Sequence, residues 1–584
     1  MIKERDGSLN LLTEPDLSRA PLDLPEEPKP AKRRPVPAWL PLVILFLEAL
    51  ALYLCTRTHL NTFDAVSYAS LMAIHRNAPG SSVAWMFHPH HLLFNAVGYF
   101  CYKTALGLGY TGNSLSVMQI VNSFLGALGL AIFYSALRRI LPREEGLALL
   151  IALAFGCSFG YWICATDGRV NMPSLILLLA AFHTLVRLLD HPNKGLAATM
   201  GLFAGGAVLF HESAGLFFFA GLLGVVLATR SKEPGKKGRG LALPAVYLAS
   251  YMAIVALPYL LIGYCLIGLH SPAAFKHWAS SYAELGWWWN FNIPYGLHQD
   301  LYAVRHALFV EPSGAGTIHL SPTVPAWLRA LYWTALAGWV IASLFLVTSL
   351  PRLFRSGRSA LVSVCLLWTV LYAVFFTIWS PGYFVFWAPV LAPVAVLLAL
   401  AIHALPRRRE GPASAALALW IALFIAINWI CSIRPNMAAA ASPFQRIALD
   451  VRAHTSPGDL IVVMGAGNDA QCEVDIPYFA ERNLLSLHST LTSAHEDAPL
   501  SLQRAQAQIA RTLGLNHQVY ALDEVLNSRP AFAALQKKHP SFSAGDLQSL
   551  MGAYRWTPAW TGPRGVVWRL VGKPNPPAPL VSIL

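Results

Sequence analysis

The sequence predicts a polytopic α-helical membrane protein of about 11 transmembrane helices, followed by a C-terminal soluble α/β domain. Of its 584 residues, 55% are hydrophobic and 12% are charged, and this charged share is about half that of an ordinary soluble protein. Long apolar segments recur along most of the chain, and segments of this kind cross bilayers as helices. After residue 433 the composition becomes mixed and polar, which predicts a separate domain.

The formal net charge is +13. The basic residues lie in short clusters between apolar segments, where they set the orientation of membrane helices rather than bind nucleic acid. We therefore expect membrane lipids as partners and no nucleic acid.

Residues 1–37 are polar and rich in proline, and they predict a disordered cytoplasmic tail before a transmembrane module over 38–433. Glu48 in the first span is expected to face other helices because a charge in the bilayer is costly. The spans are predicted at about 38–55, 114–137, 146–164, 172–189, the two legs of 195–229, 241–268, 326–349, 360–379, a tenth that ends before Arg407, and 413–432.

Arg138-Arg139 ends the second span and belongs in the cytoplasm by the positive-inside rule. Residues 91–107 therefore cannot cross, and we expect them to lie in the outer interface. The segment 195–229 is too long for one crossing and should turn outside at His211-Glu212. When the crossings are counted from these assignments, the N-terminus is expected in the cytoplasm and residues 434–584 are expected outside an inner cell membrane.

The region 434–584 is predicted to be an α/β domain, with strands near 459–465, 518–522 and 566–571 and a helix over 501–513. A glycine-rich turn, Gly465-Ala466-Gly467-Asn468-Asp469, follows its first strand. It lacks the third glycine of a dinucleotide fingerprint, so we interpret it as a strand-to-helix turn.

The predicted topology gathers polar residues on the outer side. They are Asp64, Tyr68, His88, His90 and His91 from the first loop, Asp167 and Arg169 from the second, and His211 and Glu212 from the third. An acid among them can take a proton from an acceptor, and cations or hydrogen-bond donors can stabilise a departing phosphate.

Each of these residues also has an ordinary structural interpretation. Asp64 can cap a short interfacial helix, and Asp167-Gly168-Arg169 can be an exposed turn with an ion pair worth about 0–1 kcal/mol. The pair His211-Glu212 can simply be the polar turn of a helical hairpin on the outer side. The three histidines lack the i, i+4 spacing of a two-histidine metal site, so a divalent metal ion stays an open alternative and no other cofactor is expected.

With these residues the sequence resembles the GT-C glycosyltransferases, which include protein O-mannosyltransferases, bacterial oligosaccharyltransferases and aminoarabinose transferases. The resemblance covers about 38–404 and is carried by Asp64, the His88-Pro89 element and Asp167. It implies that Asp64 is catalytic and that Asp167 supports the site. It also implies a polyprenyl-phosphate-linked sugar as donor and a lipid, glycan or protein as acceptor.

The sequence departs from the family pattern at three places. Ala65 follows the first acid where O-mannosyltransferases have Glu, His90-His91 replaces Pro-Leu, and no Asp-x-Asp stands at Asp167.

We assign Asp64 as the general base, and Arg169, His88 and His91 as partners of the phosphate. Tyr68, His90, His211 and Glu212 are expected to contact substrate. The aromatic loop 270–325 is expected either to cover the donor or to form an ordinary interfacial belt.

Two other classes of protein stay open as alternatives. A secondary transporter would show polar residues at mid-bilayer and two matching halves, and neither is evident. A non-catalytic envelope assembly protein would leave so many spans unexplained. A membrane glycosyltransferase is the favoured function.

Overall fold

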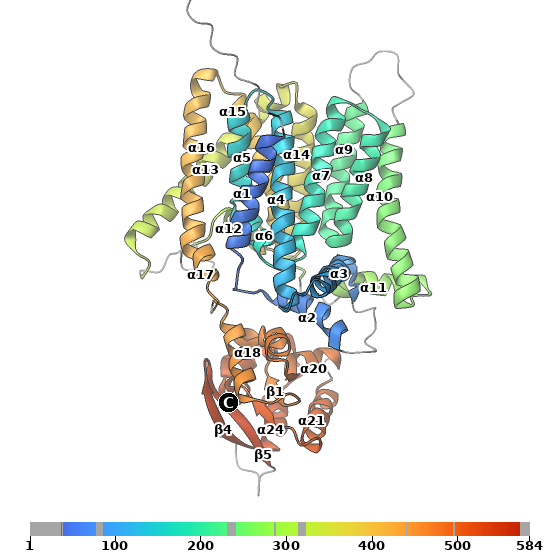
Figure 1. The fold of residues 1–584 in the computed structure, drawn as a ribbon, viewed down its shortest axis with the longest axis vertical. Coiled ribbons are helices and arrows are strands. Elements are labelled where there is room, and N and C mark those ends of the chain that lie inside the picture. The colour runs from blue at the N-terminus through green and yellow to red at the C-terminus, as the bar shows by residue number, and fades with distance from the viewer. Residues whose placement is uncertain are drawn as a thin grey trace, which may run out of the picture.

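The computed structural model describes residues 37, 39–77, 86–229, 241–284, 286, 288–312, 323–439, 441–494 and 497–572. Figure 1 shows an upright bundle of helices with a smaller region of strands and helices at one end. Nearly all of the predicted tail 1–37, the basic segment 230–240 and Trp287 lie outside the described residues.

Within the described part of the chain, 8 helices are long and apolar enough to cross a membrane, or 9 if a bent pair counts as one span. The prediction of a helical membrane protein is therefore confirmed, whereas the count of eleven spans stays a prediction. The candidates are α4 (Ser114–Ile140), α7 (Asn171–Asp190), η3 with α9 (Glu212–Thr229), α10 with η5 (Ala242–Ile267), α13 (Ala326–Arg355), α14 (Ser359–Ile378), η6 with α15 (Phe384–His403), and the run Gly411–Asn436 within α16 (Arg407–Asn428), η7 and α17 (Arg434–Asn436).

Two shorter apolar helices accompany them, α1 (Leu40–Cys55) and α8 (Lys194–Phe210). The chain turns between α8 and η3 at His211-Glu212, where the sequence predicted a turn. Glu48 lies exposed on α1, so the prediction that it faces other helices is wrong. The burial of α1 falls instead on Leu45, Ala49 and Tyr53.

The predicted span 146–164 is not one straight helix. It consists of α5 (Glu145–Gly156) and α6 (Phe159–Thr166), which meet at 64°. Ser158 leaves the helical conformation with ψ 143, and its hydroxyl donates to the carbonyl of Phe155 at 2.6 Å. The bend directs α6 so that it ends at Asp167.

Helices α2 (Phe63–Asn77) and α3 (Phe94–Gly107) lie between the bundle and the C-terminal region in Figure 1. Neither is among the candidate spans, in keeping with the prediction for 91–107. The loop after α10 contributes α11 (Pro272–Glu284) and α12 (Ile293–Leu308), and the short helix η2 (Pro89–His91) precedes α3.

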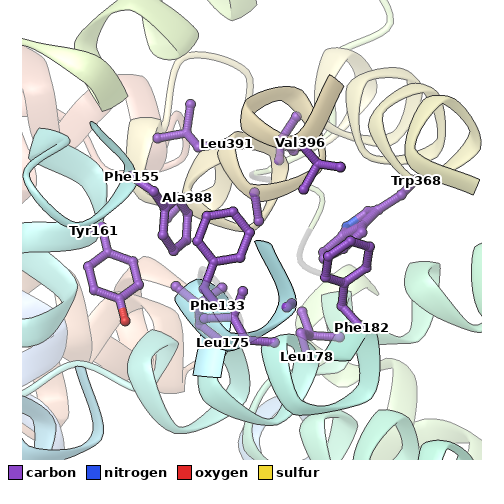
Figure 2. Close-up of a cluster of buried hydrophobic side chains, with 14 of the residues drawn as sticks. Phe133, Phe155, Tyr161, Leu175, Leu178, Phe182, Trp368, Ala388, Leu391 and Val396 are labelled. Atoms are coloured by element: carbon purple, nitrogen blue, oxygen red, sulfur yellow. The ribbon is translucent and has the colours of Figure 1, made fainter. Parts of the chain in front are cut away.

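The bundle is held by large apolar side chains from several helices and by close helix contacts. Figure 2 shows Phe133 and Phe155 beside Leu175 and Leu391 in this core. In α8, a Cβ added at Gly201 would lie 2.6 Å from the Tyr247 carbonyl oxygen. Small residues of this kind let two membrane helices pack closely.

The C-terminal region contains a five-stranded sheet of order β2-β1-β3-β5-β4. Strand β1 is parallel to its two neighbours, β2 and β3, and β5 is antiparallel to β3 and β4. The predicted helix 501–513 lies within α21. The elements are α18 (Pro443–His454), β1 (Leu460–Val463), α19 (Cys472–Asp475), η9 (Ile476–Ala480), β2 (Asn483–Ser486), α20 (Leu487–Ser493), α21 (Ala498–Gly514), β3 (Val519–Ala521), α22 (Asp523–Asn527), α23 (Arg529–Lys538), α24 (Ala544–Gly552), β4 (Arg555–Gly562) and β5 (Gly565–Gly572).

Candidate active site

Asp64 lies in the first turn of α2, at the end of the bundle that faces the C-terminal region. Its Oδ2 accepts a hydrogen bond from the Tyr383 hydroxyl at 3.2 Å. Burial raises the pKa of Asp64 above its ordinary value, and the positive charge of Arg169 acts in the opposite direction. A carboxylate with a raised pKa is a stronger base than one in water.

Asp167 and Arg169 form a buried ion pair behind Asp64. Arg169 Nε donates to Asp167 Oδ2 at 2.8 Å, and the two side chains are 7% and 0% exposed. The Thr62 hydroxyl donates to the same carboxylate oxygen at 2.9 Å. The Asn122 amide donates to the carbonyl oxygens of Asp167 and Arg169 at 2.7 and 2.8 Å. The turn is therefore fixed by two other segments, the loop before α2 and helix α4, and it is not an exposed turn.

Tyr383 connects the ion pair with Asp64. Arg169 Nη1 donates to its hydroxyl at 3.4 Å, and the guanidinium carbon lies 5.9 Å from its ring centroid. Burial raises the pKa of Tyr383 to about 12, so its hydroxyl keeps the proton that it donates to Asp64. We call Thr62, Asp64, Asp167, Arg169 and Tyr383 the acid–arginine cluster.

A second group, which we call the histidine cluster, consists of His88, His90, His91, Tyr282 and Glu212. His90 Nδ1 contacts Glu212 Oε1. The His88 ring stacks on His91 at 4.8 Å and on His90 at 5.1 Å between centroids, and Tyr282 meets His90 edge-on at 4.5 Å. These contacts bring the predicted first and third loops together.

Burial disfavours the charged form of two imidazoles in the histidine cluster, His88 and His91. Burial lowers the pKa of His88 to about 4 and holds that of His91 well below its ordinary value. His211, beside the cluster, has its pKa lowered by burial to about 4 and forms a 2.8 Å hydrogen bond with the Ser213 hydroxyl. The assignment of His88 and His91 as partners of the phosphate stays a prediction, in which they would act as neutral imidazoles because burial disfavours their charged form.

Tyr68 joins the two clusters. It lies one helical turn after Asp64 on α2, and its ring packs edge-on against His91 at 4.7 Å. All nine predicted site residues thus gather at one end of the bundle, with Asp167 buried behind the others.

The loop 270–325 reaches the same place. Tyr282, at the end of α11, stacks on Trp288 with 5.5 Å between ring centroids. Trp288 is 36% exposed, and its carbonyl accepts from the Ser380 amide at 2.7 Å. This part of the loop therefore lies over the histidine cluster and next to the turn that carries Tyr383.

Sequence reasoning missed Thr62, Asn122 and Tyr383. Tyr383 follows a Ser-Pro-Gly turn at the end of a predicted span, and a tyrosine there is also typical of an interfacial belt. Thr62 and Asn122 carry no signal of their own, since single polar residues near a span are common.

The glycine-rich turn of the C-terminal region is closed by its own acid. The buried Asp469 carboxylate accepts the Met464 and Ala466 amides at 2.8 and 3.1 Å. Burial raises its pKa to about 6. These amides, which would face a phosphate in a nucleotide site, already have a partner, so the structure agrees with a plain strand-to-helix turn.

In the described ranges, no group of at least 3 His, Cys, Asp or Glu side chains is arranged to hold a metal ion. The dependence of the protein on a divalent metal ion therefore stays a prediction.

The helical bundle, the helices beneath it and the polar clusters at one end define an integral membrane protein. Residues 99–262 match the family described as dolichyl-phosphate-mannose-protein mannosyltransferase. A crystal structure of ArnT from Cupriavidus metallidurans bound to undecaprenyl phosphate is 13% identical, with 91% of this chain and 97% of that chain covered and a TM-score of 0.53.

The apo structure of the same ArnT is also 13% identical, with 91% and 98% covered and a TM-score of 0.51. No curated protein matches the sequence. The resemblance to the GT-C superfamily is thus confirmed at the level of the fold.

Proposed function

We propose that the protein is a glycosyltransferase that moves a sugar from a polyprenyl-phosphate-linked donor to an acceptor at the extracytoplasmic membrane surface. The observation that carries this proposal is the acid–arginine cluster, in which a carboxylate of raised pKa, Asp64, lies beside a fixed guanidinium at the end of a GT-C bundle. The match to a mannosyltransferase family supports the class of reaction. The undecaprenyl phosphate of the similar ArnT structure supports the class of donor.

In the proposed reaction, Asp64 takes the proton from an acceptor hydroxyl or amine. The acceptor atom forms a bond to the anomeric carbon while the bond from that carbon to the phosphate oxygen breaks. The electron pair of the broken bond leaves on the polyprenyl phosphate, whose growing charge Arg169 and the Tyr383 hydroxyl stabilise. Asp167 does not touch substrate in this scheme, because it is buried behind Arg169 and holds its guanidinium in place.

An apolar cavity of about 240 Å³ between α5, α12, α13, α15 and α16 is the proposed place of the isoprenoid tail. Trp387, four residues after Tyr383, lines it together with Ser158 and Leu308, and Trp339 and Leu346 line it on α13. An apolar chain is the ligand that such a lining accepts at lowest cost.

The proposed topology has eleven crossings, with α1, the bent α5–α6 pair and α8 added to the eight candidate spans. It places the clusters and the C-terminal α/β domain outside the cytoplasm, and Arg138 and Arg352 inside.

Two cysteine variants test this topology. Gly514, at the end of α21, and Gly357, between α13 and α14, are both exposed, and a Cβ added at either meets no atom within 4 Å. In intact cells, Gly514→Cys should react with an impermeant thiol reagent, and Gly357→Cys should react only after lysis. The reverse pattern would overturn the extracytoplasmic site.

The function is tested by transfer of radiolabelled sugar from polyprenyl phosphates in membranes, with and without a chelator. Asp64→Asn should lower turnover by roughly 10²–10⁴-fold, the range for a general acid–base group, at unchanged expression. Asp190→Asn is the matched control, since Asp190 pairs with Arg139 at the other end of α7. Normal transfer by Asp64→Asn would refute the assignment, and a chelator effect restored by added ions would establish a metal requirement.

A further inference from the structure

The loop that leads into α2 is tied to the C-terminal part of the chain. The Gln471 side-chain amide donates to the Asn61 carbonyl at 2.7 Å, across 410 residues of sequence. The His59 amide donates to the Asn436 carbonyl at 2.6 Å. Both bonds fall within five residues of Asp64, so the backbone that carries the candidate base is held by the end of the last candidate span and by the C-terminal region.

A second tie uses the Tyr478 hydroxyl. It accepts the Leu115 amide at 3.0 Å, at the N-terminus of α4. It also lies 3.0 Å from the Ser114 hydroxyl, which donates to the Ala69 carbonyl on α2 at 2.8 Å. Tyr478 therefore links α4 and α2 to η9 of the C-terminal region.

The third observation is an apolar seam between α2 and the C-terminal region. Ala65, Val66 and Ala69 are at most 1% exposed and belong to the same buried cluster as Ile476 and Phe479. At 100° per residue Val66 lies on the side of α2 opposite Asp64 and Tyr68, and Ala65 and Ala69 lie between the two sides. One face of the helix thus docks on the C-terminal region while the other presents the two site residues.

We infer that residues 471–478 set the rotation and position of α2, which makes Gln471 and Tyr478 positioning residues for Asp64. This inference rests on the proposed function for its kinetic consequences, but its structural part does not. If α2 turned or shifted, Asp64 would leave Tyr383 and Arg169, although neither the acid nor its partners had been changed. The C-terminal region is then part of the catalytic architecture.

The test compares Gln471→Ala combined with Tyr478→Phe against Gln508→Ala in the full-length protein. Gln508 is the matched control because its amide donates to the Leu484 carbonyl at 3.0 Å, wholly inside the C-terminal region. Hydrogen exchange of the backbone amides of 63–69 should become faster in the double variant and stay unchanged in the control. The turnover number should fall by roughly tenfold to hundredfold, as for a small misplacement of a catalytic group, while the KM for the donor stays the same.

A pH profile separates positioning from a general loss of structure. Burial raises the pKa of Asp64. If the double variant exposes this carboxylate to water, its pKa falls, and the acidic limb of the rate profile should move to lower pH in that variant alone. Exchange, turnover and pH profile identical to the control would overturn the inference. If the wild type transferred no sugar, the proposed function would fail, and the exchange of 63–69 would still decide the inference. Should the double variant not fold, Gln471→Ala carries the test with the same outcomes.

Discussion

The acid–arginine cluster and the histidine cluster lie side by side at one end of the bundle, yet they balance charge in different ways. In the first, Asp167 and Arg169 neutralise each other at 2.8 Å, and their neighbours satisfy the remaining polar atoms of Asp167. In the second, burial keeps His88 and His91 neutral, and His90 Nε2 and His91 Nδ1 are buried with no hydrogen-bond partner in the part of the chain that the structure describes. A preorganised ion pair thus lies beside a group of histidines with two ring nitrogens that are able to bind a further polar group.

This difference assigns different tasks to the clusters. A fixed ion pair can stabilise charge that develops in a transition state without rearranging. Neutral imidazoles with unused nitrogens can donate or accept hydrogen bonds, which suits the recognition of a polar substrate group. We therefore expect variants of the first cluster to affect turnover and stability, and variants of the second to affect substrate binding and pH dependence.

The largest effect on stability is expected for Asp167→Asn. This change leaves the Arg169 guanidinium buried without its counter-charge, and breaking a buried pair costs about 3–5 kcal/mol. Thermal unfolding in detergent should show the loss, together with lower transfer. Asp190→Asn removes an exposed pair instead and should cost about 0–1 kcal/mol. Equal stability of the two variants would contradict the preorganised role of the first cluster.

The histidine cluster predicts an intermediate effect that depends on pH. The pKa of His88 is about 4 in the folded protein against 6.5 ordinarily. The unfolded chain therefore binds more protons between these values, and the stability conferred by the neutral ring is lost as the pH falls from about 6.5 towards about 4. Unfolding midpoints between neutral and mildly acidic pH should fall less steeply for His88→Gln.

His298→Gln is the control for this measurement, since His298 is exposed on α12. It should retain the wild-type slope. A slope that His88→Gln does not change would show that His88 is not held neutral by the fold.

The smallest effect is expected for Trp288→Ala, which removes the ring stacked on Tyr282 above the histidine cluster. An aromatic pair is worth about 0.5–1.5 kcal/mol, so the KM for the donor should rise about 2- to 10-fold. Trp327→Ala is the control for an ordinary aromatic belt, because Trp327 is 59% exposed at the start of α13. Equal behaviour of both variants would leave the loop as an ordinary aromatic belt.

Local patterns in the sequence predicted much of this arrangement. Apolar segment lengths and basic clusters marked the helices, the turn at His211-Glu212 and the segment 91–107 beneath the bundle. The break at Ser158 was missed because the apolar pattern continues through it. The short strand β2 and the Pro-containing strand β4 were missed because neither shows clear alternation.

The candidate site was only partly predictable for a physical reason. Asp64 and Asp167 could be found because acids are rare near these spans. Tyr383 meets Asp64 across 319 residues, and such a contact depends on helix packing that no local pattern encodes. The neutrality of His88 likewise depends on burial among other side chains, which the sequence does not reveal.

The bond from Gln471 to Asn61 has a consequence for the order of biosynthesis. A ribosome makes a chain from its N-terminus, and domains generally fold as they emerge. Asp64 is therefore synthesised early, whereas the residues that hold its helix arrive more than four hundred positions later. The nascent protein passes through a stage in which its helices are inserted while the reactive end is still unassembled, so completion of the last quarter of the chain acts as the final step in building the site.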